Sequence, residues 1–552
     1  MLEGCVPWPA DVAARYRRQG WWEGITIPQL LERSAARHPQ KTALVCGELR
    51  MSYDELVTGY RRLACRFLES GIKALDRVVL QLPNGPEFVL AYFALTRIGA
   101  IPVMALRAHR HSEVRHFLKA SGATAYVIPD RIGSFDYRDM AREVGPDAPA
   151  LSQVFVAGEP GPGQIDLRAM IVAPMSDEAV VAALAGHDPD PGEVTTLLLS
   201  GGTTSLSKLI PRTHEDYVLN ARLCGRAGGF TEATVFMAIL PLGHNYNLAS
   251  PGMLGTFYYG GTVVLAASGD PAEVFSLVQR EKVTVIAAVV PLISNWLNSP
   301  VPDSYDVSSL KVIQNGGARL APELRGRMRE RFGCLPQEIY GTAEGLINMV
   351  PLDAADAMLL NSSGVPVCED DEIKVLDDDG NEVPDGEPGE LVTRGPYTIH
   401  GYYNAPEKQA EAFTPDGFYR MGDIVRKQGR HVFTEGRRKD LINRGGEKIS
   451  CEEVENLIFG HPKVKAVTLV AMPDPVFGEK ACAFVIAKKG ETLEFDELIA
   501  FLRQQKIASF KLPERLEVVD EFPLSPVGKI LKRALRETIA ARIERETADA
   551  KT

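Results

Sequence analysis

The stretch that decides the fold is KTALVCGELRMSYDELVTGYRRLACRFLESGIKALDRVVLQLPNGPEFVLAYFALTRIGAIPVMA, residues 41–105. Short apolar runs alternate in it with segments of helical periodicity, in the order 41–47, 52–71, 76–83, 85–100 and 100–105. Ser52 and Glu55 have the spacing of a capping box at the start of the first helical segment. Strands that alternate with helices predict a parallel sheet covered by helices. We therefore expect an α/β fold.

The same alternation recurs around 196–265 and 283–350, which predicts a large N-terminal domain with more than one parallel-rich sheet. Residues 368–435 instead read as short strands with D-G, P-D-G and P-G turns, so a β-rich subdomain is expected there. The residues after 450 mix helical segments with strands. They predict a small α+β domain at the C-terminus.

Size, charge and cysteine pattern narrow the function. A chain of 552 residues is too long for one hydrophobic core. Its net charge of −11 argues against nucleic acid as a partner, because phosphate backbones select basic surfaces. The eight cysteines are scattered without a C-x-x-C pair, which signals neither zinc nor a disulfide framework. The apolar run at 283–293 is too short to span a bilayer and is expected to be a buried strand. With no signal-peptide pattern at the start, we expect a cytoplasmic protein without a membrane partner.

A loop rich in glycines and hydroxyls follows the apolar run in LLLSGGTTSLSKLIPRTH, residues 197–214. Glycines allow close backbone approach to an anion, hydroxyls donate hydrogen bonds, and Lys208 adds a positive charge. The P-loop pattern of NTPases fails, because Ser207 precedes the lysine and Leu209 follows it. Composition alone leaves a phosphate-binding loop and a polar surface turn equally open.

Three further segments carry candidate site residues. In 240–265, polar side chains interrupt an apolar run, either as partners of a polar ligand or as helix caps; they are His244, Asn245, Tyr246 and Ser250. The glycine-rich turns of QNGGARL (314–320) and EIYGTAEGLIN (338–348) follow apolar strands, where ligands bind on open α/β sheets. Glu344 there is a metal ligand or a charged cap.

Two single residues stand in loops of their own. Asp423, in DGFYRMGDIVR, is able to accept from two vicinal ribose hydroxyls or is simply a turn residue. Lys529, in FPLSPVGKILKRAL, is a site lysine or a solvated one.

Taken together and in this order, the segments closely resemble the acyl-adenylate-forming superfamily of acyl-CoA synthetases, luciferases and peptide-synthetase adenylation domains. Within it, the likeness is to stand-alone aryl-acid AMP ligases of siderophore pathways, which activate 2,3-dihydroxybenzoate or salicylate. The resemblance covers nearly the whole chain and rests on the motifs QLPNGPEF, KLIPRTH, HNY…SPG, AEGL, TRGPYTIHGYY, INRGGEKI and FKLPERLE.

The resemblance implies ATP and Mg²⁺ as cofactors and a role for each candidate. The loop that would hold the phosphates comprises Ser200, Gly201, Gly202, Thr203, Thr204 and Lys208. The adenine and α-phosphate region would be lined by Gly317, Ala318, Arg319 and Gly341. Asp423 and Arg437 would hold the ribose, and Glu344 would be the Mg²⁺ ligand. Lys529 and His244 would join Glu344 in catalysis. Asp440 would be the hinge between a domain of residues 1–439 and a small, mobile domain of residues 440–552.

For the acid, the resemblance implies that Asn245 binds an ortho hydroxyl, that Tyr246 forms an aromatic wall and that Ser250 suits a 3-hydroxyl. Asn315 and Gly316 would border the acid. Ser205 and Asn315 depart from the subgroup, which usually has glycine and valine there. An amide in place of valine suggests an additional polar substituent on the acid, such as the amine of 3-hydroxyanthranilate.

The expected reaction joins an ortho-substituted aryl acid to AMP, releases pyrophosphate and transfers the aryl group to the phosphopantetheine thiol of an aryl carrier protein. An aryl-CoA ligase that uses free coenzyme A is the alternative, and a silent relative that only binds aryl-AMP is a third. The last is disfavoured because every expected charged site residue is present, namely Lys208, Glu344, Asp423, Arg437 and Lys529.

Overall fold

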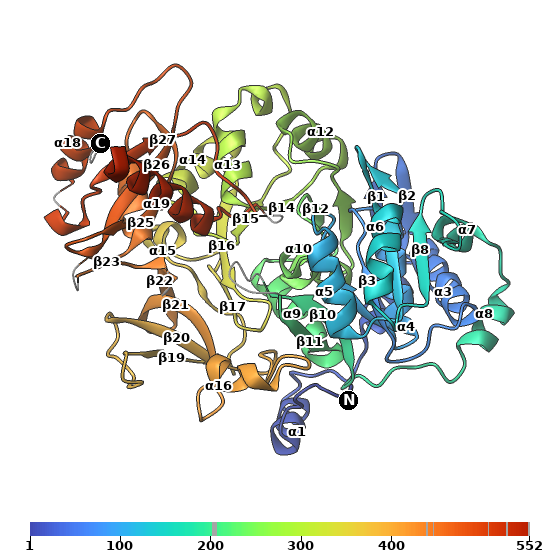
Figure 1. Ribbon diagram of the computed structural model, residues 1–552. Helices are drawn as coiled ribbons and strands as arrows, with labels where there is room; N and C mark the ends of the chain where they lie inside the picture. The colour runs from blue at the N-terminus through green and yellow to red at the C-terminus, as the bar shows by residue number, and fades with distance from the viewer. Residues whose placement is uncertain (201–206, 438–439, 445–446, 506, 526–527, 550–552) are drawn as a thin grey trace.

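The computed structural model describes residues 1–549 except 201–206, 438–439, 445–446, 506 and 526–527. Two large sheets form the N-terminal part of the chain, and a smaller β-rich sheet follows them in sequence. In Figure 1 the C-terminal part, in orange and red, lies beside the yellow-green α13 and α14, while β3 and β8 lie at the opposite side of the molecule. The expected α/β fold with a β-rich subdomain and a small C-terminal domain is confirmed.

The larger sheet has nine strands in the order β18-β17-β16-β15-β14-β12-β13-β1-β2. The neighbours from β1 to β16 are parallel, whereas β2, β17 and β18 are antiparallel to theirs. Their bounds are Thr42–Cys46 (β1), Leu49–Ser52 (β2), Val235–Ala238 (β12), Thr262–Leu265 (β13), Val285–Ala288 (β14), Val312–Gly316 (β15), Leu335–Gly341 (β16), Ile347–Met349 (β17) and Val365–Pro366 (β18). The parallel strands therefore end at one common edge.

The second sheet has seven strands in the order β11-β10-β4-β3-β5-β8-β9, parallel except for the β10–β11 hairpin. The bounds are Arg77–Leu80 (β3), Ile101–Met104 (β4), Ala125–Pro129 (β5), Gln153–Ala157 (β8), Ile165–Asp166 (β9), Val194–Leu199 (β10) and Leu209–Thr213 (β11). A short separate hairpin joins Arg131–Ile132 (β6) to Phe135–Asp136 (β7).

Residues 41–105 contribute strands to both large sheets, which the alternation of elements did not predict. β1 pairs with β13, with Leu44 opposite Val263, while β3 and β4 belong to the second sheet. The local pattern fixes strand and helix but not the distant partner of each strand, which depends on long-range packing. The run 283–293 is also only partly a strand, because β14 ends at Ala288 and helix α13 begins at Val290.

Helices cover the sheets of the large part. Their bounds are Ala10–Arg18 (α1), Ile27–Arg37 (α2), Tyr53–Glu69 (α3), Pro86–Arg97 (α4), His111–Ser121 (α5), Tyr137–Val144 (α6), Leu167–Val172 (α7), Asp177–Leu184 (α8), His214–Ala227 (α9), Asn245–Ala249 (α10), Gly252–Tyr258 (α11), Pro271–Glu281 (α12), Val290–Asn298 (α13), Pro322–Phe332 (α14), Asp356–Asn361 (α15) and Gln409–Ala412 (α16). The predicted capping box is confirmed, because the Glu55 N–H donates to Ser52 Oγ (3.2 Å) and the Ser52 N–H donates to Glu55 Oε2 (2.7 Å).

Two mainly antiparallel units complete the chain, with β26 and β27 of the second unit as a parallel pair. The β-rich sheet comprises Glu372–Leu376 (β19), Pro388–Arg394 (β20), Tyr419–Gln428 (β21) and His431–Arg437 (β22). The small domain contains Ile442–Arg444 (β23), Glu447–Ile449 (β24), Val464–Asp474 (β25), Gly478–Ala487 (β26), Arg515–Val518 (β27), Cys451–Phe459 (α17), Phe495–Gln504 (α18) and Lys532–Asp549 (α19). Among the described residues, no helix is long and apolar enough to cross a membrane.

A buried guanidinium on β11 links three segments of the large part. Arg212 and Asp216 are both fully buried, and Arg212 Nε donates to Asp216 Oδ1 at 2.7 Å. Its Nη1 donates to the carbonyl oxygen of Ala343 (3.0 Å) and its Nη2 donates to that of Tyr397 (3.2 Å). Burying a charge is unfavourable unless it is paired and hydrogen-bonded, and here Nε, Nη1 and Nη2 each donate a hydrogen bond. Arg212 therefore fixes the backbone next to Glu344.

Arg212→Ala should lower the free energy of unfolding by about 3–5 kcal/mol, because it leaves Asp216 buried without its cation. The four tryptophans, Trp8, Trp21, Trp22 and Trp296, all lie in the large part, so their fluorescence in a urea titration reports on that part. The control is Arg142→Ala, which breaks an exposed pair with Asp139 and should cost less than about 1 kcal/mol. Equal losses in the two variants would contradict this role of Arg212.

Candidate active site

The stem of the glycine-rich loop is closed by a pair of hydrogen bonds between Ser200 and Lys208. The Ser200 N–H donates to the Lys208 carbonyl oxygen (3.0 Å), and the Lys208 N–H donates to Ser200 Oγ (2.9 Å). The loop residues themselves lie outside the described part of the chain, including the predicted Gly201, Gly202, Thr203 and Thr204 and the departure at Ser205. The hydrogen bonds of the stem place Lys208 at the end of the β10–β11 hairpin.

Lys208 and Glu344 meet at one aromatic side chain. Lys208 Nζ lies 4.5 Å from the centroid of the Tyr402 ring, and the Tyr402 hydroxyl donates to Glu344 Oε1 at 2.9 Å. Glu344 is buried, and its carbonyl oxygen accepts from the Ile399 N–H (2.8 Å). Burial and the Glu344 charge raise the pKa of Tyr402, so the phenol stays protonated and keeps donating. The structure thus brings a lysine to the ring and a carboxylate to the hydroxyl of Tyr402.

The polar residues of the 240–265 segment lie around α10. His244 is the N-cap, and its Nδ1 accepts from the Tyr246 N–H (3.3 Å). Asn245 Oδ1 accepts from the Tyr217 hydroxyl (2.8 Å), and Asn245 Nδ2 donates to Ser250 Oγ (3.2 Å). Ser250 Oγ also accepts from Asn220 Nδ2 (3.1 Å). Asn245 and Ser250 are therefore buried members of one network, positioned by two residues of α9.

Tyr246 packs against the end of β15. A Cβ built on Gly316 would lie 2.8 Å from Tyr246 Cε1, which is closer than real Cβ contacts. The ring therefore takes the space that any side chain at 316 would fill. Burial raises the pKa of Tyr246 well above its usual value, and the nearby Glu338 carboxylate adds to the shift. The structure brings Tyr246 and Gly316 together, whereas the amide of the preceding Asn315 donates to Glu338 Oε2 (3.0 Å).

Lys529 of the small domain reaches the same edge of the large sheet. A Cβ built on Gly317, which has φ +84°, would lie 3.2 Å from Lys529 Cε. Burial, with a further contribution from the positive charge of Lys529, lowers the pKa of His244 to about 3. His244 is therefore a neutral imidazole beside a lysine at physiological pH. Val289, between β14 and α13, lies next to the loop of Lys529, 3.4 Å from a Cβ built on Gly528.

Asp423 occupies a buried position on β21 opposite Arg437 of β22. The hydroxyl of Tyr340, on β16, donates to Asp423 Oδ2 at 2.8 Å. Gly341, next to Tyr340, packs closely against the turn that carries Glu344. A Cβ built on Gly341 would lie 2.3 Å from the Leu346 carbonyl oxygen. The side chain of Arg437 lies outside the described residues.

Arg319 and the predicted hinge residue both connect to small-domain helices. Arg319 Nη1 lies 3.5 Å from Glu452 Oε1 on α17, and Arg319 Nη2 donates to the Asn361 carbonyl oxygen (2.9 Å). Ala318, beside it, offers its carbonyl oxygen to Asn315 Nδ2 (2.7 Å). Asp440 pairs with Arg536 Nη1 of α19 (2.9 Å).

Sequence reasoning missed the residues that hold the expected ones in place. They are Arg212, Tyr217, Asn220, Glu338, Tyr340, Tyr402 and Glu452. Tyr402 stands in the quoted motif TRGPYTIHGYY, so the resemblance offered a signal for it. Arg212 stands in the quoted motif KLIPRTH and had the same signal. The other five contact their partners over long sequence separations, which no local pattern shows.

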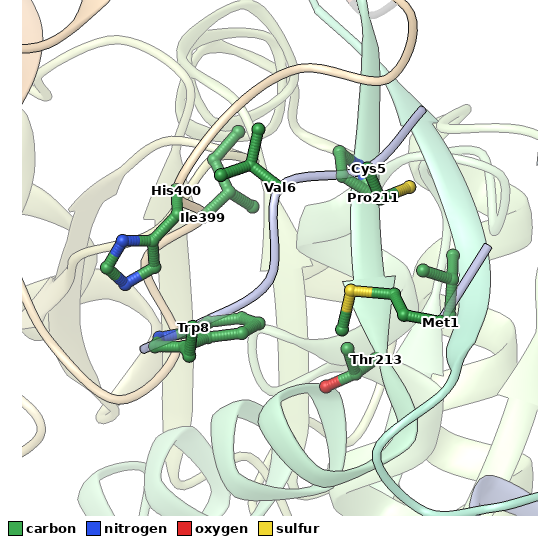
Figure 2. Close-up of a pocket in the computed structure, with 9 residues that line it drawn as sticks. Met1, Cys5, Val6, Trp8, Pro211, Thr213, Ile399 and His400 are labelled. Carbon is green, nitrogen blue, oxygen red and sulfur yellow. The ribbon is translucent and has the colours of Figure 1, made fainter. Parts of the chain in front are cut away.

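A separate cavity lies beneath the N-terminal segment. Figure 2 shows Trp8 and His400 on one side of it and Met1 and Cys5 on the other. Its volume is about 10 Å³, which is room for about one water molecule and for neither an aryl acid nor a nucleotide. The cavity is a packing feature of the N-terminal segment.

The comparisons with known proteins agree with this geometry. The family described as AMP-binding enzyme matches residues 31–403, and the AMP-binding enzyme C-terminal domain matches residues 453–529. The chain belongs to the AMP-binding enzyme family. It is an adenylating ligase, because its relatives over nearly the full length include proteins named AMP ligases.

Three relatives show how complete the similarity is. The chain is 45% identical to the 2,3-dihydroxybenzoate-AMP ligase of Bacillus subtilis (strain 168), with 98% of this chain and 99% of that protein covered. It is also 45% identical to a salicylyl-CoA synthase / salicylate adenylyltransferase of Streptomyces sp., with 98% and 99% covered. The solved apo structure of Mycobacterium smegmatis MbtA is 37% identical and matches with a TM-score of 0.73, covering 97% of this chain and 98% of that one.

Gly317→Ala should reduce adenylation at least about tenfold, because the added Cβ crowds Lys529 and because alanine is strained at positive φ. The control is Gly380→Ala, which has a similar φ of +87° but open space around the new Cβ. It should carry the same backbone strain and leave adenylation near the wild-type rate. Pyrophosphate exchange measures both variants, and equal activities would show that contact with the lysine is irrelevant.

Glu452 should make the docking of the small domain pH-dependent. Burial raises its pKa to about 7, with Arg319 and Lys532 opposing and with Glu455 and Glu338 reinforcing the shift. A pKa above the ordinary 4.5 means that the docked state binds the proton more tightly. Docking should therefore weaken as pH rises through about 7.

Hydrogen–deuterium exchange of residues 317–321 between pH 6 and 8 measures this effect. Exchange should increase with pH, after correction for the intrinsic rate, and Glu452→Gln should abolish the dependence. Glu453→Gln is the matched control, because Glu453 lies on the same helix but pairs with Lys511 inside the small domain. The same pH dependence in Glu452→Gln as in wild type would contradict the assignment.

Proposed function

We propose that the protein activates an ortho-substituted aryl acid, of the 2,3-dihydroxybenzoate or salicylate type, with ATP to give the aryl-AMP and pyrophosphate. The aryl group then passes to the phosphopantetheine thiol of an aryl carrier protein, in siderophore or related natural-product biosynthesis. The named activities of the two 45% identical relatives support the acid class. The observation that carries the proposal is the position of Lys529, which reaches from the small domain to Gly317 at the end of β15.

The chemistry of adenylation explains why a lysine is needed there. A carboxylate must attack the α-phosphate, and both groups are anionic. Two like charges about 4 Å apart repel by roughly 4 kcal/mol at an effective dielectric constant of 20. The Lys529 ammonium would offset this repulsion and stabilise the charge of the transition state. His244 beside it is neutral, so it adds no second cation and instead shapes the position of the lysine and of α10.

The nucleotide would lie between the β10–β11 hairpin and β21. Lys208 and the 200–204 loop would hold the β- and γ-phosphates, and the Asp423 carboxylate would accept from the ribose hydroxyls with Arg437 beside it. Gly317, Ala318, Arg319 and Gly341 would line the adenine and α-phosphate region. Tyr340 would hold the Asp423 carboxylate in place through its hydroxyl.

Glu344 suits a role as ligand of Mg²⁺. The described residues contain no group of three or more His, Cys, Asp or Glu side chains that could hold a metal by themselves. Mg²⁺ in nucleotide enzymes is usually held by one or two carboxylates together with the substrate phosphates, so a single buried carboxylate fits. The ion would neutralise phosphate charge when bound. Tyr402 would orient the Glu344 carboxylate.

The acid would bind between α10 and the end of β15. Asn245 has one amide N–H beyond the one that it donates to Ser250, which suits an ortho hydroxyl. The Tyr246 ring would form the wall, with Gly316 behind it, and Ser250 would face a 3-hydroxyl. Asp440, which is tied to α19 through Arg536, would be the hinge between residues 1–439 and 440–552.

Free coenzyme A is the second candidate for the thiol. It is favoured by one observation, because the Streptomyces relative of equal identity is named a salicylyl-CoA synthase as well as an adenylyltransferase. Single-turnover thioester formation from pre-formed aryl-AMP, with holo carrier protein or coenzyme A in parallel, separates the two. We expect the carrier protein to react faster, and faster reaction with coenzyme A would assign the alternative.

ATP–pyrophosphate exchange with salicylate, 2,3-dihydroxybenzoate, anthranilate, 3-hydroxyanthranilate and benzoate tests the adenylation step. Exchange should be strong with at least one ortho-substituted acid and weak with benzoate. Lys529→Ala should lower it on the order of 10²–10³-fold, because charge stabilisation in the transition state is lost. Lys463→Ala, which removes a small-domain lysine paired with Glu497, should leave it unchanged. No exchange with any acid would refute the proposal.

A further inference from the structure

The segment before α1 is held in place by contacts with the large part of the chain. Residues 1–9, which we call the strap, form neither helix nor strand, and they run along residues 396–404, the loop that follows β20. Figure 2 shows the strap between this loop and β11. Leu2 and Trp8 of the strap are buried, and the Leu2 N–H donates to Glu193 Oε1 (2.6 Å) directly before β10. The proposed chemistry uses no residue of the strap.

The strap contacts the loop on both sides of Tyr402. The Asn404 N–H donates to the Gly4 carbonyl oxygen (3.0 Å). A Cβ built on Gly401 would lie 2.5 Å from Val6 Cγ2, so the Val6 side chain packs directly on the backbone of the loop. Since Gly401 and Asn404 flank Tyr402 in the sequence, these two contacts hold the backbone that carries the phenol.

Two tryptophans anchor the earlier part of the same loop. The Trp8 ring lies with its centroid 5.3 Å from the His400 ring and 5.3 Å from the Trp22 ring. Trp22 Nε1 donates to the Pro396 carbonyl oxygen (2.9 Å). Trp8 Nε1 is buried and has no hydrogen-bond partner among the described residues, so Trp8 contributes through packing.

The loop also contacts the two charged side chains on the nucleotide side of the candidate site. The Ile399 N–H donates to the Glu344 carbonyl oxygen (2.8 Å), and the Tyr402 hydroxyl donates to Glu344 Oε1 (2.9 Å). Lys208 Nζ lies over the Tyr402 ring. A loop lacks the hydrogen-bond ladder of a sheet, so its position depends on the groups that pack against it. The strap is one of those groups.

We propose that the strap is a positioning element of adenylation, which holds the 396–404 loop and thereby sets the place of Tyr402 between Lys208 and Glu344. The inference rests on the proposed function and assigns to it a segment of the chain that the chemistry does not use. Lys208 would hold the phosphates of ATP, whereas the acid would bind at α10 and β15. A loosened strap should therefore weaken the binding of ATP and leave the binding of the acid unchanged.

Trp8→Ala tests this by removing the packing between the strap and His400. The KM for ATP in pyrophosphate exchange should rise at least about tenfold, because small displacements of positioning groups are costly. The KM for the acid should stay near the wild-type value. Trp8→Phe keeps an aromatic ring and loses no hydrogen bond, so it should restore most of the affinity for ATP.

Two measurements do not depend on turnover. Calorimetric titration with MgATP in the absence of acid should show the same weakening in Trp8→Ala. Hydrogen–deuterium exchange of residues 399–403 should become faster, because the Ile399 and Tyr403 N–H groups donate to the Glu344 and Leu209 carbonyl oxygens only while the loop is held.

Phe155→Ala is the matched control for stability. Phe155 is a fully buried ring on β8 that packs against Phe67 at a centroid distance of 5.1 Å, in the second sheet. Its truncation should lower the urea midpoint of unfolding about as much as Trp8→Ala does. The KM for ATP and the exchange of residues 399–403 should stay near wild type, which separates positioning from folding.

Gly4→Val keeps the proposal testable if Trp8→Ala does not fold, because position 4 is exposed. Gly4 has φ +90°, and a Cβ there would lie 2.0 Å from Asn404 Oδ1 and 3.3 Å from Tyr403 Cε2, so valine should displace the strap from the loop. Gly20→Val is its control, because Gly20 has φ +75° and open space around the new Cβ. Only Gly4→Val should raise the KM for ATP.

The possible failures are distinguishable. A wild-type KM for ATP in both Trp8→Ala and Gly4→Val overturns the inference and leaves adenylation intact. Equal increases in the KM for ATP and the KM for the acid also overturn it, because they indicate a general loss of structure. No exchange by the wild type with any acid overturns the proposed function and the inference with it.

Discussion

The buried pair of Arg212 and Asp216 is the interaction on which the proposed nucleotide side of the site depends. The guanidinium reaches the carbonyl oxygens of Ala343 and Tyr397, so it joins the β10–β11 hairpin to the two loops that carry Glu344 and Tyr402. These loops then meet at the Tyr402–Glu344 hydrogen bond, with Lys208 over the same ring. The three side chains, Lys208, Glu344 and Tyr402, come from distant parts of the chain, and the Arg212 guanidinium holds the segments that carry them together.

The proposed acid side of the site depends instead on glycines, which let other side chains approach the backbone closely. Gly316 makes room for the Tyr246 ring and Gly317 for the Lys529 side chain, so two consecutive glycines at the end of β15 hold an aromatic wall and a cation from another domain. Parallel strands bring their carboxyl ends to one edge, which is where an α/β sheet binds ligands. The Arg319–Glu452 contact links this edge to the small domain, and burial raises the pKa of Glu452 at that contact to about 7.

Much of the fold and part of the candidate site could be predicted from the sequence, and physical reasons explain which parts could not. The capping box of Ser52 and Glu55 is local, and so it was predicted and is confirmed. The placement of β1 in the larger sheet, apart from β3 and β4, was missed, because strand pairing is decided by distant packing rather than by the local pattern. At the site, motif resemblance pointed to Lys208, Glu344, Asp423 and Lys529, whose roles remain predictions. The contact of Tyr340 with Asp423 could not be predicted, because it joins segments far apart in the sequence. The same holds for the contact of Arg212 with the Ala343 carbonyl oxygen beside Glu344, although Arg212 itself stands in the motif KLIPRTH.

The most direct test of this account is a crystal structure with an aryl-adenylate analogue in which a sulfamate replaces the phosphate. The account predicts the aryl ring between Tyr246 and the end of β15, the ribose hydroxyls on Asp423 and the Lys529 ammonium at the linkage between acid and sulfamate. An analogue bound away from the β15 edge, or bound there with Lys529 and Asp423 both out of contact, would contradict it.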